Sequence, residues 1–340
     1  MALRQRSTTA TTAAPSTAPT PSHTPAPMAT ASEGWRLPAA WVPKLPNTKL
    51  LLYGDSGTGK STFTATYSEA ARVIGMPMLV FAFDPPSKMT PYRDVGVESV
   101  PVQDQAMREW YEASGIEAED VIDAQGNLLI RIECYVDPDP ENPRAADTLE
   151  ARLGGFYNDA PNWYAVVFDS MTFYQNASIR RAQKRLNFTI DKMFAKGEGV
   201  DMRQWSGIAK MDIQRTLLHQ ALWWKTNVVA IHHTSEEKTE FADTVVRGIS
   251  TVGKLKSDMP PGFDEMYRVK LNMKERIRDA SGRETEDYKR ILQTRHDSLW
   301  AATSVTAKAP NPCEPHYLAL WQNWQAKMEG KGGETIGDNK

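Results

Sequence analysis

One short segment constrains the fold of this chain more than any other feature. Residues 54–61 read Gly-Asp-Ser-Gly-Thr-Gly-Lys-Ser and match the pattern G-x-x-x-x-G-K-[ST] in full. An apolar run, Lys49–Tyr53, precedes them, and a helical stretch, Lys60–Ile74, follows. Glycines let the backbone curl so that successive N–H groups point at one anion, and the next helix directs its positive N-terminus at the same charge. The segment therefore predicts a strand, a phosphate-binding loop and a helix, in that order.

The residue types in this loop specify the ligand further. We expect Lys60 to reach the β- and γ-phosphates of a nucleoside triphosphate and Ser61 to place its hydroxyl on Mg²⁺. The nucleotide-binding residues are then predicted to be Gly54, Asp55, Ser56, Gly57, Thr58, Gly59, Lys60, Ser61 and Thr62. The chain is therefore predicted to bind ATP or a similar nucleotide together with Mg²⁺.

A second candidate for the metal lies far downstream of the loop. The apolar run Tyr164–Phe168 ends in Asp169. An aspartate at the end of such a strand can hold the Mg²⁺ that bridges the phosphates. An ordinary strand-ending turn gives the same pattern, so the assignment of Asp169 depends on the complete phosphate loop upstream.

Short apolar runs alternate with helical stretches through the body of the chain. The runs are Lys49–Tyr53, Met78–Phe83, Leu128–Val136, Tyr164–Phe168 and Asn227–Ile231. They lack polar alternation, as strands buried on both faces do, and therefore predict an α/β fold with a mostly parallel central sheet. Flanking helices are expected over Thr172–Lys196 and Ile208–Trp224. A C-terminal antiparallel extension is expected from Tyr267–Met273, Tyr288–Gln293 and Ser298–Thr303, with a turn at Ser281-Gly282.

The two ends of the chain have a different character. Residues 1–33 are rich in Thr, Ala and Pro and are predicted to be a disordered tail. A transit peptide would also explain the lack of acidic residues there, but the prolines oppose the amphipathic helix that it needs. Residues 313–328 predict an amphipathic helix that docks on the body of the chain or on a neighbouring subunit, and residues 329–340 predict a second disordered tail. The helical face consists of Tyr317, Trp321, Trp324 and Met328.

Composition excludes several classes of protein. The only cysteines, Cys134 and Cys313, are far apart, which argues against a structural zinc site and a disulfide framework and favours a cytoplasmic setting. The sequence contains no run of about 18 apolar residues, so it predicts no membrane-spanning helix. The net charge of −2 shows no overall affinity for nucleic acid, so any such site must be a local patch.

The order of the polar positions carries a family resemblance. After the loop come Asp84, at the end of Met78–Phe83, then Asp169, and then the pair His232 and His233 at the end of the fifth run. In this order the chain resembles the RecA-like ATPases, in particular the phage single-strand annealing and recombination ATPases built on one RecA core. The segment 290–295 and Trp300 resemble the closing hairpin of that group.

The resemblance implies a fold and a set of roles. Residues 34–312 would form the RecA-like P-loop domain, and the protein would be a homo-oligomer with nucleotide at its subunit interfaces. It would act on single-stranded DNA in the cytoplasm of a bacterium or a phage-infected host. Asp84 would polarise the attacking water, and His232 or His233 would sense the γ-phosphate, although a polar strand end also explains the histidines. Lys254 and Lys256 would reach the nucleotide of the adjacent subunit, although a solvated pair of charges explains that spacing as well.

The chain departs from the family pattern at the catalytic acid. The family places a glutamate two residues after an aspartate, where this chain has Asp84 and then Pro86. Either Asp84 acts itself, or hydrolysis is slow, or the base lies elsewhere, with Glu133 and Glu236 as the remaining candidates. Ser170 follows Asp169, where AAA ATPases and packaging motors usually carry a catalytic glutamate, and this residue therefore argues against both of those groups.

Charge leaves two interpretations of a nucleic-acid surface open. The segment Arg247–Arg295 holds twelve Lys and Arg against eight Asp and Glu. A second basic cluster, expected on a helix, consists of Arg180, Arg181, Lys184 and Arg185. Interleaved aromatic residues are Phe241, Phe263, Tyr267, Tyr288 and Trp300. Single-stranded DNA binding needs such a basic, stacking surface, but a mixed-charge hairpin whose aromatics face the core is equally consistent. A helicase, a small-metabolite phosphotransferase and a nucleotide-gated binding protein remain as alternative functions.

Overall fold

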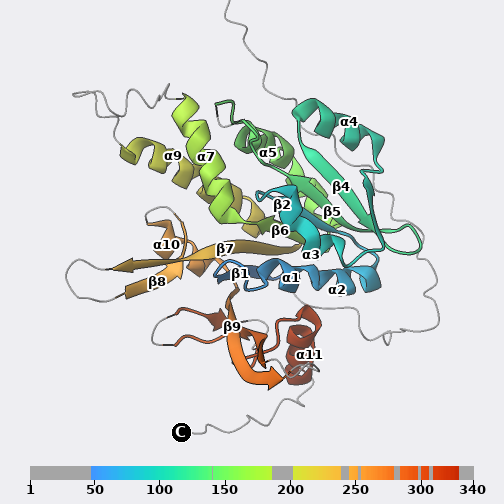
Figure 1. Ribbon diagram of the computed structural model, residues 1–340. Helices are drawn as coiled ribbons and strands as arrows, with labels where there is room; N and C mark the ends of the chain where they lie inside the picture. Colours follow the sequence, from blue (N-terminus) through green and yellow to red (C-terminus); the bar gives the residue numbers. More distant parts are fainter. Residues whose placement is uncertain are drawn as a thin grey trace, which may run out of the picture.

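The computed structural model describes residues 47–139, 141–185, 202–238, 245–251, 254–278, 284–297, 300–305 and 309–328. Both predicted tails and the predicted turn at Ser281-Gly282 lie outside these residues. The body is built on one sheet with the strand order β10-β9-β1-β7-β6-β2-β5-β4-β3 (Figure 1). The predicted α/β class with a mostly parallel central sheet is confirmed.

The centre of the sheet is parallel and its margins are antiparallel. The parallel strands are β9 (Glu265–Arg278), β1 (Lys49–Gly54), β7 (Asn227–Lys238), β6 (Ala165–Asp169), β2 (Met78–Ala82) and β5 (Leu128–Cys134). The antiparallel strands are β10 (Glu284–Gln293), β11 (Thr303–Ser304), β4 (Glu117–Ile122), β3 (Glu98–Pro101) and β8 (Val245–Ile249), the last paired with the outer half of β7.

Helices cover both faces of the sheet. One face carries α1 (Lys60–Ala65), α2 (Tyr67–Ile74), α3 (Thr90–Arg93) and α11 (Tyr317–Met328). The other carries α4 (Gln105–Ser114), α5 (Ala145–Leu153), α6 (Phe156–Asp159), α7 (Met171–Arg185) and α9 (Met202–Ile213). The short helix α10 (Leu255–Asp258) precedes β9. Single helical turns cover Pro86–Met89, Ala160–Asn162, Gln214–Leu218, Ala221–Trp223 and Pro260–Gly262.

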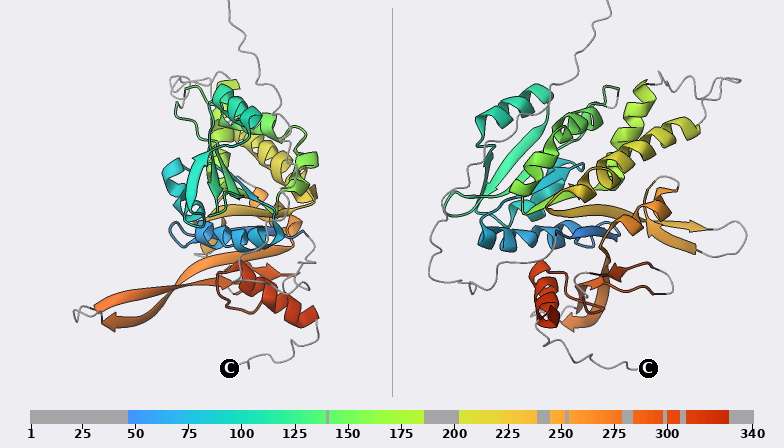
Figure 2. Two further views of the ribbon diagram at one scale, coloured as in Figure 1. Left: turned by 90° about the vertical axis from the view of Figure 1, so that its right-hand side faces the viewer. Right: turned by 180° about the vertical axis from the view of Figure 1, so that it is seen from behind.

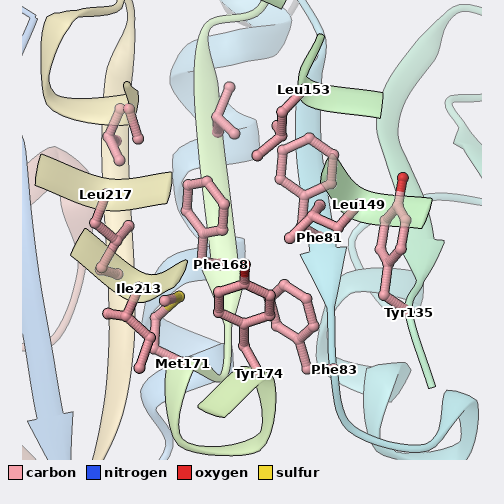
Figure 3. Close-up of a cluster of buried hydrophobic side chains, with 14 of the residues drawn as sticks. Phe81, Phe83, Tyr135, Leu149, Leu153, Phe168, Met171, Tyr174, Ile213 and Leu217 are labelled. Atoms are coloured by element: carbon pink, nitrogen blue, oxygen red, sulfur yellow. The ribbon is translucent and has the colours of Figure 1, made fainter. Parts of the chain in front are cut away.

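Strand alternation divides the core into two layers. Leu51 and Tyr53 of β1 pack with the layer that contains α5, α7 and α9, whereas Leu50 and Leu52 pack with α1 and α2, because successive side chains of a strand point to opposite faces. Aromatic and aliphatic side chains from β2, β6 and α7 fill the first layer (Figure 3). This packing fixes the carboxyl ends of β1, β6 and β2 relative to one another.

The strand that separates the loop strand from the Asp169 strand is β7. Along the chain, Met78–Phe83 lies between the loop and Asp169, but in the sheet β2 lies on the far side of β6. β7 pairs with both β1 and β6. His232 and His233, in the middle of β7, therefore lie beside the start of the loop, and the end of β2 lies beside Asp169.

The predicted antiparallel extension begins with a parallel strand. β9 pairs parallel with β1, and only β10 and β11 run antiparallel to β9. β9 thus extends the central sheet by one strand before the chain turns back. Together β9 and β10 form a twisted ribbon that projects from the body (Figure 2).

Two predicted helices are interrupted. Lys60–Ile74 divides at Thr66, whose hydroxyl donates to the carbonyl of Phe63. α9 begins at Met202 and ends at Ile213, and the chain continues to Trp224 in a π turn and a 3₁₀ turn. The apolar residues spaced along one face of the predicted helix, Ile213, Leu217, Ala221 and Trp224, are all buried.

The C-terminal helix α11 packs against the body of its own chain. The ring of Tyr317 stacks on that of Tyr67 in α2, with centroids 3.8 Å apart, and its hydroxyl lies 2.8 Å from the hydroxyl of Tyr164. Trp321 is also buried. The side chains of Trp324 and Met328 lie outside the described residues. Nowhere in the described part of the chain is a helix both long and apolar enough to cross a membrane.

Candidate nucleotide-binding site

The loop after β1 has the backbone that its glycines predict. Gly57 and Gly59 adopt φ values of 76° and 94°, a left-handed conformation that other residues rarely take. Gly54 is required for a different reason, because a Cβ there would lie 2.4 Å from the carbonyl oxygen of Val269 in β9. Each of the three motif glycines is therefore required by the local backbone conformation or by close packing. The loop ends at the N-terminus of α1.

Lys60 lies inside this loop. Its ammonium group donates hydrogen bonds to the carbonyls of Gly54 (2.9 Å) and Asp55 (2.7 Å). Burial lowers the pKa of Lys60, while the negative charges of Asp169, Asp55 and Asp84 oppose that change. A buried cation held by carbonyl groups at the bottom of the loop is well placed to exchange them for phosphate oxygens.

Ser61 and Asp169 meet as the sequence predicts. The hydroxyl of Ser61 donates to Oδ2 of Asp169 at 2.7 Å. The hydroxyl of Tyr92, from α3, donates to the same oxygen at 2.8 Å. Burial raises the pKa of Asp169, whereas both hydrogen bonds and the charge of Lys60 lower it. A hydroxyl and a carboxylate in contact form the oxygen donor set that suits Mg²⁺.

Asp84 stands beside this pair. The N–H of Phe83 donates to the carbonyl oxygen of Asp169 at 2.7 Å and so aligns the ends of β2 and β6. Burial, and then the negative charge of Asp169, raise the pKa of Asp84 to about 6, while a hydrogen bond with Ser170 and the charges of Lys60 and Lys88 oppose the rise. A carboxyl with that pKa can accept a proton near neutral pH.

Pro86 does not leave the site incomplete. Together with Pro85 it turns the chain out of β2 and begins the helical turn Pro86–Met89. The following α3 brings Tyr92 back to Asp169. Pro86, at the position where the family that the chain resembles has a glutamate, thus belongs to a connection that returns the hydroxyl of Tyr92 to the carboxylate of Asp169.

β7 contributes one histidine and one threonine from its middle, where its pairing with β1 ends and its pairing with β8 begins. His233 is half-buried, and its pKa is lowered to about 4 by burial and then by the charge of Lys60, so it is neutral at pH 7. The hydroxyl of Thr234 donates to the carboxylate of Asp55 in the loop. His232 is completely buried and equally neutral, with a pKa of about 4. Of the two histidines expected to sense the γ-phosphate, His233 is therefore the one near Lys60.

Glu133 is excluded as the catalytic base. It is fully buried in β5 and accepts hydrogen bonds from the hydroxyls of Tyr111 (2.5 Å) and Tyr135 (2.6 Å). Arg152 donates to it at 3.2 Å. Its hydrogen-bonding capacity is thus used inside the fold. The side chain of Glu236, the other alternative, lies outside the described residues.

Lys254 and Lys256 lie at the start of α10. Lys254 precedes the helix and is exposed, and Lys256 lies within it and is half-buried. The role expected for them involves the nucleotide of a second subunit, so their position in one chain does not test it.

A family model described as an AAA domain matches residues 46–304. The chain belongs to the AAA domain family. The match includes the loop from Gly54 to Ser61 as well as Asp84 and Asp169, and it identifies the protein as a P-loop ATPase by family. It also includes Ser170, so the expectation that a serine there argues against an AAA domain is wrong. The match ends before α11, which lies outside the matched residues.

Two solved structures resemble the AAA domain of this chain at low identity. A KaiC-like protein from the hyperthermophilic archaeon Pyrococcus horikoshii is 16% identical over 74% of this chain and 80% of its own, with a TM-score of 0.35. The flagellar accessory protein FlaH from Methanocaldococcus jannaschii is 11% identical over 73% and 78%, with a TM-score of 0.32. A search of curated proteins gave no match.

The sequence did not reveal two residues of the AAA domain's site. Tyr92 is separated from Asp169 by 77 positions, and Thr234 from Asp55 by 179. Neither belongs to a spaced motif. The polar residues that follow the fifth apolar run, His232, His233 and Thr234, were the only indication in the sequence that this edge of the sheet carries polar groups.

Proposed function

We propose that this AAA domain protein hydrolyses ATP with the aid of Mg²⁺. The observation that carries the proposal is the convergence of Lys60, Ser61, Asp169 and Asp84 at or beyond the carboxyl ends of β1, β6 and β2. Ser61 and Asp169 are within 2.7 Å of each other, and Asp84 is near enough to Asp169 for their charges to interact. This combination provides a cradle, a cation, a metal-binding pair and a base.

Each residue has a defined task in this mechanism. The backbone N–H groups of the loop hold the phosphates, and Lys60 neutralises charge on the β- and γ-phosphates. Ser61 and Asp169 would hold Mg²⁺, which when bound draws electron density from the phosphate oxygens. Tyr92 orients the Asp169 carboxylate. These contacts position the γ-phosphate for in-line attack by water.

Asp84 completes the chemistry. As water attacks the γ-phosphorus, a new P–O bond forms and the bond to the β–γ bridging oxygen breaks, with its electron pair leaving on ADP. Asp84 orients the water and accepts its proton. Neutral His233, near Lys60, is placed to hydrogen-bond the γ-phosphate without adding charge. This assigns the sensing role to His233.

We expect the pH profile to report on Asp84. Only the carboxylate form accepts a proton, so kcat/KM should rise about tenfold per pH unit below about 6 and level off above it. The measurement is ATP hydrolysis from pH 5 to 8 at saturating Mg²⁺, with ADP affinity followed in parallel to remove any effect on binding. A flat profile between pH 5 and 7 would contradict this role.

Single-stranded DNA is the second element of the proposal. It is supported by the resemblance and by the excess of positive charge in Arg247–Arg295. Two other expected contributions are corrected. Phe263, Tyr267 and Trp300 are buried and cannot stack on bases, and Arg181 lies buried among acidic side chains.

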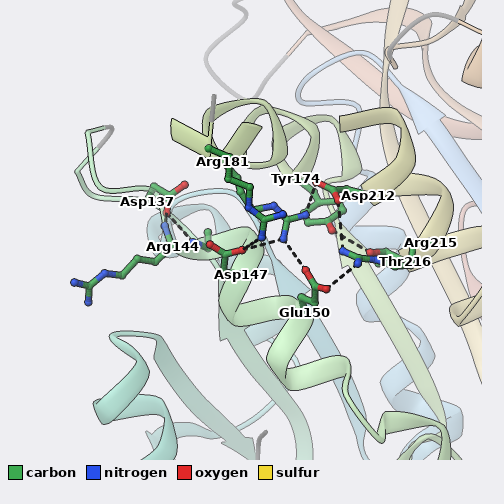
Figure 4. Close-up of polar contacts among 11 residues, drawn as sticks. Asp137, Arg144, Asp147, Glu150, Tyr174, Arg181, Asp212, Arg215 and Thr216 are labelled. Carbon is green, nitrogen blue, oxygen red and sulfur yellow. Dashed lines mark hydrogen bonds and ion pairs between the residues drawn. The ribbon is translucent and has the colours of Figure 1, made fainter. Parts of the chain in front are cut away.

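The contacts of Arg181 show that this member of the basic cluster on α7 is structural. Its guanidinium pairs with Asp147 (3.1 Å), Glu150 (2.8 Å) and Asp212 (Figure 4). Arg185 pairs with the same Asp147 at 2.8 Å. These ion pairs connect α5, α7 and α9. Because Phe263, Tyr267 and Trp300 are buried, we expect DNA binding to rely mainly on phosphate contacts, which predicts strong salt dependence and little sequence preference.

The proposed assembly is a homo-oligomer. In it Lys254 and Lys256 of one subunit would reach the nucleotide of the next, as the resemblance implies. The exposed position of Lys254 on a short helix is compatible with such a contact.

The deciding experiment measures ATP hydrolysis with and without single-stranded DNA. We expect Mg²⁺-dependent turnover by the parent and none by Lys60→Ala, because the variant lacks the cation that neutralises the phosphates. Intact nucleotide binding without turnover would instead identify a nucleotide-gated binding protein. Turnover that is unaffected by DNA would remove the DNA element alone, and turnover that requires a small acceptor would identify a phosphotransferase.

A further inference from the structure

The β9–β10 ribbon forms one wall of the phosphate loop. At one point the carbonyl oxygen of Val269 in β9 occupies the space that a side chain at position 54 would need. At a second point Arg290 in β10 does the same for position 59. An ideal Cβ on Gly59 would lie 2.5 Å from Cδ and 2.6 Å from Nε of Arg290. The two glycines that begin and end the glycine pattern therefore both face the ribbon.

The strand register explains how Arg290 reaches the loop. β9 pairs with β1 as far as Arg268 opposite Tyr53 and then continues beyond the end of β1. β10 returns along it, with Arg290 opposite Leu271. Arg290 is thus level with the loop rather than with the strand below it.

The direction of the side chain follows from alternation along β10. Leu292, two residues on, is fully buried in the core layer that contains Phe63 of α1. Residues two apart in a strand share a face, so Arg290 faces the side of the sheet where α1 begins. Its neighbour Lys289 points to the opposite face, and both side chains are exposed.

The charge of Arg290 has no acidic partner in the part of the chain whose side chains are described. No ion pair or hydrogen bond of its guanidinium occurs among those residues. Its stem and Nε instead lie against Gly59, in the section of the loop whose N–H groups cradle the α- and β-phosphates. Arginine offers several donors in a planar arrangement that matches phosphate oxygens.

We propose that Arg290 binds the α- or β-phosphate of the nucleotide held by this loop. The proposal rests on the proposed function, since it assumes a nucleotide in the loop. In this proposal β10 supplies a phosphate-binding side chain, and the site is completed by a residue of the same chain. Because the contact is to the α- or β-phosphate, Arg290 strengthens the binding of ADP as much as that of ATP, whereas Lys60 acts at the β- and γ-phosphates.

The test measures ADP and ATP affinity by calorimetry under conditions that prevent turnover. Arg290→Ala should weaken both nucleotides about tenfold, the loss expected for one charge-assisted contact. Arg290→Lys should recover part of the affinity, because a lysine keeps the charge but not the fork of donors. Lys289→Ala is the matched control: it removes the same charge from the adjacent, opposite-facing position and should bind as the parent does.

The outcomes separate the two proposals. If Lys60→Ala loses binding while Arg290→Ala binds both nucleotides as tightly as the parent, the role of Arg290 is overturned and the proposed function stands. If Lys289→Ala weakens binding equally, the effect is one of general charge and the role is overturned as well. A parent that binds no nucleotide overturns both. The exposed Arg290 variants should retain the parent's unfolding temperature without nucleotide, so a folding defect would be visible separately.

Discussion

Asp84→Asn is expected to lower kcat for ATP hydrolysis about a thousandfold, within the range that a positioned general base contributes. Asparagine keeps the shape of the side chain but cannot accept the proton of the attacking water. Binding should survive, because Lys60, Ser61 and Asp169 remain in place. The measurement pairs steady-state hydrolysis with ATP affinity for parent and variant.

The stability of this variant provides its control. The folded pKa of Asp84, about 6, lies above the ordinary value of 3.8. The charged form therefore opposes folding at neutral pH, and the protein regains that stability as the pH falls through about 6. Asparagine is neutral at every pH, so the variant should unfold at or above the parent's temperature at pH 7. Parental turnover in Asp84→Asn would refute the assignment of the base.

The sequence predicted the parts of the fold that depend on local patterns. Five short, mostly apolar runs became strands of the parallel region, and the loop became a loop because its glycines allow positive φ. The edge strands β3 and β4 were not predicted. β3 is four residues long and mostly exposed, so it lacks the apolar content that marks a strand in sequence.

The sequence could not predict which strands become neighbours. Chain order placed Met78–Phe83 between the loop and Asp169, whereas the sheet places β7 there. The register of the strands and their order in the sheet depend on packing between segments that are far apart in the chain. The spacing of residues within one segment carries no information about that packing. The contacts of Tyr92 with Asp169 and of Arg290 with Gly59 belong to the same class.

The basic cluster on α7 shows a related limit. Its charges were visible in the sequence, but the acids that pair with Arg181 come from α5 and α9. A run of positive residues on a helix says nothing about acidic residues that the fold brings against it. The pairs with Asp147, Glu150 and Asp212 account for that part of the pattern as packing between helices.

Glu133→Gln is expected to lower the stability of the fold and to leave turnover unchanged, which is the opposite of the result expected for Asp84→Asn. Glu133 balances the charge of Arg152, which is 2% exposed and pairs more weakly with Asp159 at 3.5 Å. Removing one partner of a buried ion pair leaves the other charge uncompensated, so we expect a loss of about 3 kcal/mol in the free energy of unfolding. The midpoint of urea-induced unfolding measures this loss.

Turnover by folded Glu133→Gln should equal that of the parent, because its carboxylate is held by Tyr111, Tyr135 and Arg152 within the fold. Glu112→Gln, an exposed position on α4, serves as the matched control and should change neither quantity. If Glu133→Gln kept the parent's urea midpoint and lost turnover, the proton acceptor would be Glu133. We expect Glu133→Gln to lose stability and keep turnover, and Asp84→Asn to keep stability and lose turnover. That pair of results would identify the carboxylate of Asp84, just after β2, as the proton acceptor.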